Sequence, residues 1–179
     1  MKVLVIGNGG REHAIADSLA HDHRVHAVYV APGNGGTGDV GRNIPLHATD
    51  VAGLAAFAME HHIDLTVIGS ENSLALGIVN AFQERYLPIF GPTAAAARIE
   101  SSKVFAKQLM RKAGIPTALY RHYENCRDAG MDFTTTFPCV VKDSGLAQGK
   151  GSFICRTMED MECALCVIAE RNRGKNPVV

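Results

Sequence analysis

The sequence predicts an α/β fold whose first part is a parallel sheet with helices on both faces. Short apolar runs such as 3–6 and 65–68 end at glycine, as buried parallel strands often do. Segments with apolar residues at helical spacing separate these runs, and this alternation is typical of a sheet covered by helices. The expected strands are Val3–Ile6, His26–Val30, Leu65–Ile68 and Pro88–Phe90, and the expected helices are residues 11–20, 50–61 (capped by Asp50) and 74–82.

The alternation ends near Pro92, and the second part predicts an α+β organisation. Residues 93–113 predict two helices, the second of them capped by Ser101 or Ser102. Further along the chain, two strands are joined directly by a glycine-rich loop instead of a helix. The expected elements here are strands at 118–120, 137–142 and 152–156 and a helix at 157–171. We therefore expect two domains, residues 1–100 and residues 101–179.

Charge and composition favour neither a nucleic-acid partner nor a membrane partner. The 179 residues include 18 basic and 18 acidic side chains, so the net charge gives no support for a nucleic-acid or membrane-surface partner. The apolar start of the chain breaks at Gly7, which is too short for a signal peptide or a membrane span, and a cytoplasmic location is expected. Five cysteines, none before Cys126, do not form a disulfide framework. Cys163 and Cys166 are expected to lie on one buried helix face.

The first strand is followed by a glycine-rich turn, Gly7-Asn-Gly-Gly-Arg-Glu12. It departs from the dinucleotide fingerprint because Glu12 occupies the position of the third glycine. The turn opens a helix N-terminus, where backbone amides suit an anion, and Arg11 adds a guanidinium that can grip phosphate. His13 adds a donor that can change its protonation state. A tight turn with a solvated helix start explains the same residues equally well.

A second glycine-rich stretch, Gly145 to Gly151, joins two predicted strands. It is not a Walker A loop, because it has three residues between the first glycines, lacks the Ser or Thr after Lys150, and leads into a strand. Its glycines allow backbone amides to approach phosphate oxygens. Lys142, at the end of the preceding strand, would direct a positive charge at the same phosphates. A surface hairpin with two solvated lysines is the alternative, and for so short a motif it is favoured.

Five segments together resemble a known family. GNGGREHA at 7–14, APGN at 31–34, IDLTVIG at 63–69, GPTAAAARIESSKVFAK at 91–107 and VKDSGLAQGKG at 141–151 occur in this order. This set resembles the phosphoribosylamine–glycine ligases, also called glycinamide ribonucleotide synthetases, of the ATP-grasp superfamily. The resemblance covers almost the whole chain. It implies a Rossmann-like, substrate-binding domain in residues 1–100 and an incomplete ATP-grasp domain in residues 101–179.

The resemblance also implies two groups of binding residues. Those for phosphoribosylamine would be Asn8, Gly9, Gly10, Arg11, Glu12, His13, Asn34 and Glu71. Those for ATP would be Lys103, Lys142, Ser144, Gly145, Leu146, Ala147, Gln148, Gly149, Lys150 and Gly151. Without the resemblance, Asn34 is most simply a turn residue, Glu71 a helix cap and Lys103 a solvated lysine.

The implied activity is the ATP-dependent ligation of glycine to phosphoribosylamine in purine biosynthesis. A glycyl phosphate forms first, and the amine then displaces phosphate to give glycinamide ribonucleotide. Such chemistry needs positioning and charge neutralisation, so no residue is expected to act as a covalent catalyst. The cofactors would be ATP and Mg²⁺ or Mn²⁺, with the metal ligands expected in a C-terminal part that this chain lacks.

Length is the largest departure from the family. The family enzymes continue far beyond residue 179, so the chain alone is expected to be inactive, as a fragment or as a split subunit completed by a partner chain. Asp143 and Gln148 also stand where alanines are expected, and Asp143 either weakens ATP binding or faces solvent. Two alternatives stay open: a non-catalytic sugar-phosphate or nucleotide-binding module, and another ATP-grasp enzyme such as a purine carboxylase or a biotin-dependent carboxylase subunit.

Overall fold

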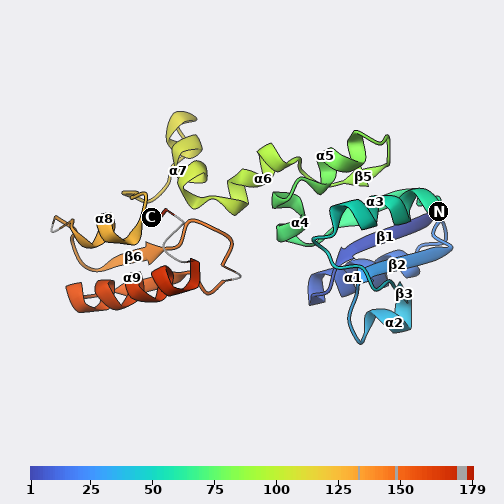
Figure 1. Cartoon of the computed structure of the whole chain (residues 1–179), viewed down its shortest axis with the longest axis horizontal. Helices are drawn as coiled ribbons and strands as arrows, with labels where there is room; N and C mark the ends of the chain where they lie inside the picture. The colour runs from blue at the N-terminus through green and yellow to red at the C-terminus, as the bar shows by residue number, and fades with distance from the viewer. Residues whose placement is uncertain (133, 148, 173–176) are drawn as a thin grey trace. The chain divides into compact units, whose positions relative to one another are not determined.

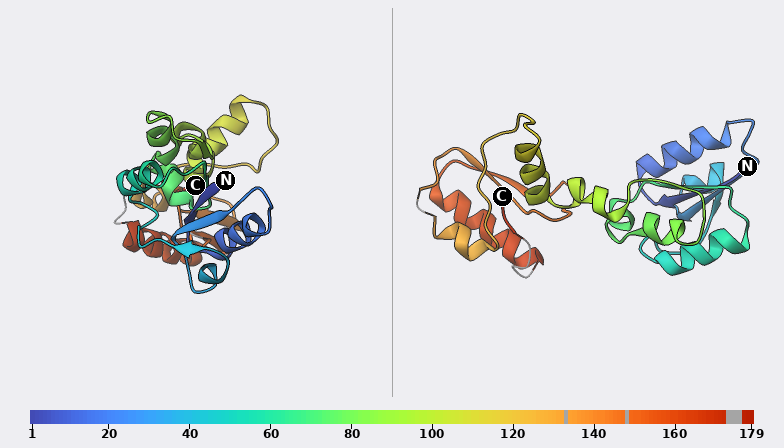
Figure 2. Two further views of the ribbon diagram at one scale, coloured as in Figure 1. Left: turned by 90° about the vertical axis from the view of Figure 1, so that its right-hand side faces the viewer. Right: turned by 90° about the horizontal axis from the view of Figure 1, so that it is seen from above.

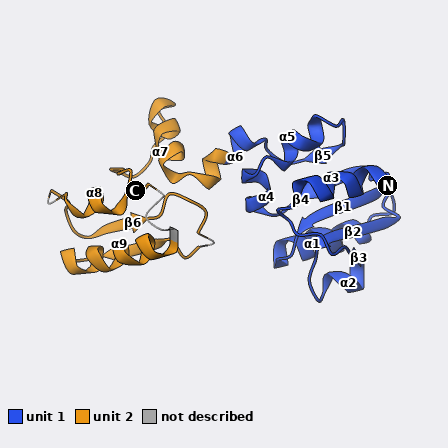
Figure 3. Ribbon diagram, viewed as in Figure 1, with its two compact units in different colours: residues 1–97 blue, residues 98–179 orange. Residues whose placement is uncertain are grey.

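The structure is a computed structural model that describes residues 1–132, 134–147, 149–172 and 177–179. The chain forms two compact units, Met1–Ala97 and Arg98–Val179 (Figures 1 and 3). The division into a substrate-binding domain, residues 1–100, and an ATP-grasp part, residues 101–179, stays a prediction. None of the described helices has the length and apolar character needed to cross a membrane.

Unit 1 is built on a parallel sheet, as the sequence predicts. Its strands lie in the order β3-β2-β1-β4-β5, and every pair is parallel. The central strand β1 pairs on both sides, with Val5 opposite Val30 and opposite Val67. The strand bounds are β1 Lys2–Gly7, β2 Ala27–Pro32, β3 Arg42–Asn43, β4 Leu65–Ile68 and β5 Ile89–Phe90.

Both faces of this sheet are covered by helices (Figure 2). Side chains alternate between faces along β1, so Val5 packs against Ala16 of one helix layer while Leu4 and Ile6 pack in the opposite layer with Leu54. All of these side chains are fully buried. The helices within unit 1 are α1 Gly10–Ala20, α2 Thr37–Val40, α3 Val51–Glu60, α4 Glu71–Ala75 and α5 Ile78–Gln83, and α6 Ala94–Ser101 begins in unit 1 and ends in unit 2.

Local signals explain most helix boundaries in unit 1. Asp50 caps α3 as predicted, and its Oδ1 accepts a hydrogen bond from the Gly53 N–H at 2.9 Å. The single helix predicted at 74–82 is wrong, because Gly77 adopts a left-handed conformation, with φ +80°, between α4 and α5. The short elements α2 and β3 have no periodic signal and are not predicted.

Unit 2 contains an antiparallel pair, β6 Cys139–Lys142 and β7 Ser152–Cys155, with Lys142 opposite Ser152. Val178 adds bridges to Tyr123 and Asp143. Ser102 caps the second of the two helices predicted in 93–113, with its Oγ accepting from the Phe105 N–H at 3.3 Å. The helices of this part are α7 Lys103–Lys112, α8 Cys126–Gly130 and α9 Met158–Asn172.

Two expectations for unit 2 are wrong. Residues 118–120 form no strand. Cys163 and Cys166 are exposed, because the buried stripe of α9 is formed by other residues at spacings of three and four. That stripe, which packs in a core with Val141 and Cys155, consists of Met161, Ala164, Leu165 and Ile168.

Candidate functional site

The predicted substrate residues of unit 1 follow three different strands. Asn8–His13 follow β1, Asn34 follows β2 and Glu71 follows β4. Because these strands are parallel and adjacent, their carboxyl ends meet at one edge of the sheet. The structure therefore brings these side chains together, and direct contacts join them.

Glu12 fixes the turn between β1 and α1. It is 6% exposed, and its Oε2 accepts a hydrogen bond from the Gly9 N–H at 2.6 Å. Its side chain fills the space beside Gly7 and Gly69, where an added Cβ would lie 2.5 Å from Cγ and 2.1 Å from Oε1, respectively. Gly7 also has φ +138°, so this position needs glycine for both space and conformation. The carboxylate therefore organises the turn from inside.

Arg11 links the same turn to the end of β4. Its Nη1 donates to the Gly69 carbonyl at 3.2 Å, and its Nη2 lies 3.3 Å from Glu71 Oε1. The Arg11 side chain is 64% exposed, so its guanidinium is accessible to an anion from solvent. Glu71 is not the cap of α4; Ser70 holds that position.

Asn34 joins the loop after β2 to the turn after β1. Its Nδ2 donates to the carbonyls of Asn8 and Gly9, at 3.0 and 3.3 Å. The loop also packs on His13: a Cβ added to Gly36 would lie 2.4 Å from the imidazole Cε1. Three loops thus form one connected surface that combines backbone amides, a guanidinium and an imidazole.

In unit 2, Lys103 is hydrogen-bonded to the start of the glycine-rich loop. Its Nζ donates to the Gly145 carbonyl at 2.9 Å, and its backbone N–H donates to the Ser144 carbonyl at 2.9 Å. Ser144 Oγ also accepts from the Val104 N–H at 3.2 Å. The N-terminus of α7 is therefore attached to the loop, and Lys103 is not simply a solvated lysine.

Asp143 is buried, so of its two predicted alternatives the one in which it faces solvent is wrong. It is 4% exposed, and its Oδ1 accepts from the Gly145 N–H at 3.0 Å. Gly151 lies across from it, and an added Cβ there would be 2.5 Å from the Ala147 Cβ. Gly149 has φ +77°. The loop backbone thus requires at least two of its glycines, while Gln148 lies outside the described residues.

Lys142 lines a cleft of about 730 Å³ within unit 2. Lys107, one turn after Lys103 on α7, lines it as well, and its Nζ donates to Thr117 Oγ1 at 2.7 Å and lies 5.4 Å from the centre of the Tyr120 ring. Neither Lys107 nor Tyr120 was among the predicted site residues. A helical i, i+4 spacing from Lys103 is the signal that could have pointed to Lys107.

Two residues that line this cleft, Arg121 and Tyr123, share one carboxylate partner. Arg121 Nη1 lies 2.6 Å from Asp132 Oδ2, and the Tyr123 hydroxyl donates to the same oxygen. Hydrogen bonds from Thr134, Tyr123 and Arg121 hold the pKa of Asp132 well below its usual range. The pKa of Tyr123 is raised mainly by burial and further by the hydrogen bond with Asp132. Asp132 is therefore a fixed negative charge that keeps Arg121 in place.

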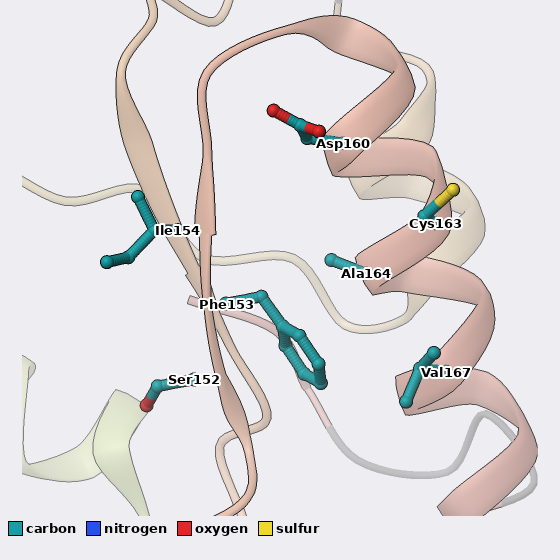
Figure 4. A pocket seen from close by; sticks show the side chains of 7 residues that line it. All are labelled: Ser152, Phe153, Ile154, Asp160, Cys163, Ala164 and Val167. Carbon is teal, nitrogen blue, oxygen red and sulfur yellow. The ribbon is translucent and has the colours of Figure 1, made fainter.

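A smaller hollow of about 440 Å³ lies between β7 and α9 (Figure 4). It contains none of the predicted site residues. Asp160, at its rim, accepts from the N–H groups of Arg156 and Thr157, at 2.8 and 3.1 Å, so it caps the start of α9. Across the described parts of both units, no group of three or more His, Cys, Asp or Glu side chains is placed to hold a metal ion.

Comparison with protein families decides the identity of the chain. Residues 1–100 match the model of the phosphoribosylglycinamide synthetase N domain. Residues 101–179 match the model of the ATP-grasp (A) domain of the same synthetase. The chain belongs to the phosphoribosylglycinamide synthetase family. The resemblance in the five sequence segments is thereby confirmed.

Named relatives agree with the family assignment. A phosphoribosylamine–glycine ligase of Ralstonia nicotianae is 48% identical over 176 residues, which cover 97% of this chain and 41% of the relative. The crystal structure of the corresponding ligase of Thermotoga maritima aligns with a TM-score of 0.73 and 32% identity, covering 99% of this chain and 42% of that one. The present chain spans about two fifths of the length of these synthetase relatives.

A more distant structure shows how widely the fold is shared. N5-carboxyaminoimidazole ribonucleotide synthetase of Thermotoga maritima aligns with a TM-score of 0.69 at 20% identity, which shows a common fold alone. Because both domain models of the synthetase match, the alternative of a different ATP-grasp enzyme is not supported. The assignment of single residues to phosphoribosylamine or to ATP stays a prediction for this synthetase chain.

Proposed function

We propose that the chain supplies the phosphoribosylamine site and the first part of the ATP site of a ligase that joins glycine to phosphoribosylamine. The observation that carries this proposal is the match to two consecutive domains of one synthetase over residues 1–100 and 101–179. The ligase would use ATP and release ADP and phosphate. The reaction belongs to purine biosynthesis.

In unit 1, the sugar phosphate is proposed to bind at the turn after β1. The N-terminus of the 11-residue helix α1 offers backbone N–H groups and the positive end of its dipole. Arg11 adds a charged guanidinium that can form paired hydrogen bonds with phosphate oxygens. Glu71, which lies beside Arg11, adds a hydrogen-bond acceptor for the amine of the substrate.

In unit 2, the phosphates of ATP are proposed to meet Lys103, Lys142 and the loop Ser144–Gly151. Gly149 and Gly151 allow the backbone to approach a ligand closely, because neither position suits a larger side chain. These groups would neutralise negative charge during phosphoryl transfer. Magnesium or manganese would supply further charge neutralisation, but the described residues offer no cluster for it, so its ligands are proposed to come from elsewhere in the family protein.

The chain alone is proposed to bind substrate without completing the ligation. The family relatives have about three fifths of their length outside the part matched here. A second candidate function, a non-catalytic sugar-phosphate-binding module, follows from the same fact, since unit 1 has its own core.

One experiment on this chain tests both functions. Glycine-dependent ADP formation is measured with freshly prepared phosphoribosylamine and MgATP, and ribose 5-phosphate binding is measured by calorimetry. We expect no turnover, and binding that Arg11→Ala weakens by more than tenfold with an unchanged melting temperature. Failure to bind ribose 5-phosphate would contradict the proposed site. Turnover that Lys142→Ala abolishes would support the ligase function. It would also contradict the proposal that catalysis requires residues outside this chain.

A partner test then separates the ligase from the module. Adding the remaining segment of the Ralstonia relative as a separate chain is expected to yield ADP formation that needs glycine, and Lys142→Ala is the matched inactive control. Absence of ADP formation in a complex that demonstrably assembles would favour the module.

A further inference from the structure

The loop Gly33–Thr37 is held by a hydrogen-bond network that no sequence motif predicted. Thr37 is fully buried, and its Oγ1 accepts from the Asn34 N–H at 2.7 Å. The same hydroxyl lies 2.7 Å from Asn43 Oδ1 and 2.9 Å from the Asn34 carbonyl, so its proton serves one of these oxygens. Asn43 Nδ2 also donates to the Asn34 carbonyl, at 2.9 Å. The backbone of Asn34 is therefore fixed through both its N–H and its carbonyl.

The side chain of Asn34 is committed to the protein at both ends. Its Oδ1 accepts from the N–H groups of Gly36 and Thr37, at 2.9 and 3.1 Å. Its Nδ2 donates to the carbonyls of Asn8 and Gly9. An amide that uses both its oxygen and its nitrogen in this way has little capacity left for a ligand.

The bonds from Asn34 set the direction of the turn amides. In a trans peptide, the carbonyl and the following N–H point in opposite directions. Holding the Gly9 carbonyl toward Asn34 and toward the His13 N–H, 3.1 Å away, therefore directs the Gly10 N–H outward from the start of α1. That is the direction in which a helix N-terminus receives an anion.

Close packing at Gly33 holds this hydrogen-bond network in a single arrangement. Gly33 has φ +75°, and a Cβ at this position would lie 2.2 Å from Asn43 Oδ1 and 2.7 Å from Thr37 Oγ1. Only glycine at this position lets the two polar side chains approach the loop backbone. The edge strand β3 thus reaches the turn after β1 through Asn43, Thr37 and Asn34 in succession.

We propose that Asn34 is a positioning residue for sugar-phosphate binding and not a ligand contact, and that Thr37 and Asn43 hold it in place. This inference rests on the proposed function and deepens it. The ligand class is a pentose 5-phosphate, whose phosphate is received by turn amides that Asn34 orients. Sequence reasoning placed Asn34 in the substrate site, and the network changes its role there.

Isosteric variants separate positioning from folding. Thr37→Val keeps the shape of the side chain and removes the hydroxyl, whereas Thr37→Ser keeps the hydroxyl. Asn34→Asp keeps the oxygen that accepts from Gly36 and Thr37 but removes the donor to the turn. Gly35→Ala is a control in the same loop, because an added Cβ there meets nothing within 4 Å.

The test uses the 179-residue chain with ribose 5-phosphate as the probe. Binding is measured by calorimetry, and the backbone amide resonances of Gly9 and Gly10 are recorded without ligand. We expect Thr37→Val and Asn34→Asp to weaken binding at least tenfold and to shift both amide resonances. Thr37→Ser and Gly35→Ala should stay within twofold of the unmodified chain, with resonances in place.

The two readouts keep the inference separate from the proposed function. If the unmodified chain does not bind ribose 5-phosphate, the proposed function fails, and the amide resonances still decide whether Asn34 orients the turn. If folded Thr37→Val binds as tightly as the unmodified chain and its Gly9 and Gly10 resonances stay unchanged, the inference is overturned. If Thr37→Val does not fold, Asn34→Asp decides by the same two measurements.

Discussion

Arg11 and Glu71 form an ion pair across the edge of the parallel sheet, with Nη2 of the arginine 3.3 Å from Oε1 of the glutamate. The two residues are 60 positions apart in the sequence and meet because β1 and β4 are neighbouring parallel strands. The side chains are 64% and 37% exposed, so water screens their attraction. The pair therefore contributes little to folding and leaves the guanidinium ready for a phosphate.

Replacing this glutamate should affect binding more than stability. We expect Glu71→Gln to change the free energy of unfolding by less than about 1 kcal/mol, the usual range for exposed pairs. Ribose 5-phosphate should bind severalfold more tightly, because a negative charge next to Arg11 is removed. Calorimetry and urea unfolding measure the two effects. Weaker binding would instead show that the Glu71 carboxylate accepts a hydrogen bond from the sugar.

The turn after β1 should tolerate no side chain at Gly7. Its φ of +138° and the Glu12 Cγ, which would lie 2.5 Å from an added Cβ, both oppose alanine. We expect Gly7→Ala to lower the free energy of unfolding by about 1–3 kcal/mol. Gly35→Ala is the matched control, and its effect should lie within about 1 kcal/mol in either direction. Equal effects in urea unfolding would show that Glu12 does not constrain the turn.

Repeating patterns allowed much of the fold to be predicted. The strands at the centre of unit 1 are short apolar runs ended by glycine, and their pattern depends only on local sequence. Gly77 interrupts the predicted helix with a left-handed conformation, which glycine adopts readily and which the periodicity of apolar residues does not reveal. On α9, the spacing of Cys163 and Cys166 predicted a buried face, but the buried stripe is the one that includes Met161 and Ile168.

The candidate site was predictable by residue type but not by role. Glycine spacing located both loops, and the charged residues near them were easy to find. Whether Asn34 contacts a ligand or orients a turn depends on hydrogen bonds to Asn8 and Gly9, more than 20 residues away. Tyr120 lines the cleft of unit 2 through tertiary folding, and for Lys107 the only local signal is its helical spacing from Lys103.

The five cysteines should divide into two classes of reactivity. Cys163 and Cys166 are exposed, whereas Cys155 is fully buried. Burial raises the pKa of the Cys126, Cys139 and Cys155 thiols, so the reactive thiolate is depleted in the folded state. We expect iodoacetamide at neutral pH to modify Cys163 and Cys166 first, as read by mass spectrometry of peptides.

The sign of the thiol shift gives a pH dependence. Folding raises the pKa of the buried thiols, so the folded state favours the protonated thiol. Its contribution to stability is fully present below the pKa of the unfolded thiol, about 8.5, and is lost as the pH rises through the folded pKa. Labelling of Cys155 should therefore accelerate as the pH rises above the pKa of the unfolded thiol, together with loss of stability. Cys155→Ser, which removes this thiol, is the control that identifies the slowly labelled peptide. Rapid labelling of Cys155 at pH 7 would contradict its buried position.

The Asp132 cluster should make unit 2 sensitive to acid. Hydrogen bonds from Thr134, Tyr123 and Arg121 hold the folded pKa of Asp132 far below its usual value of about 3.9. For a carboxyl group with a lowered pKa, the contribution to stability is present above the unfolded pKa and is lost as pH falls through the folded one. Asp132→Asn should therefore lower the urea midpoint at pH 7, and the difference from the unmodified chain should shrink steadily below about pH 4.

A second carboxylate in the same unit provides the control for this acid effect. Glu162 is exposed on α9, so Glu162→Gln should leave the urea midpoint of the chain nearly unchanged at pH 7. Tyr123→Phe removes one donor to Asp132 and should produce a smaller loss than Asp132→Asn, with the same direction of pH dependence. A gap between Asp132→Asn and the unmodified chain that stays constant from pH 7 to pH 2 would show that the aspartate acts through packing and not through its charge.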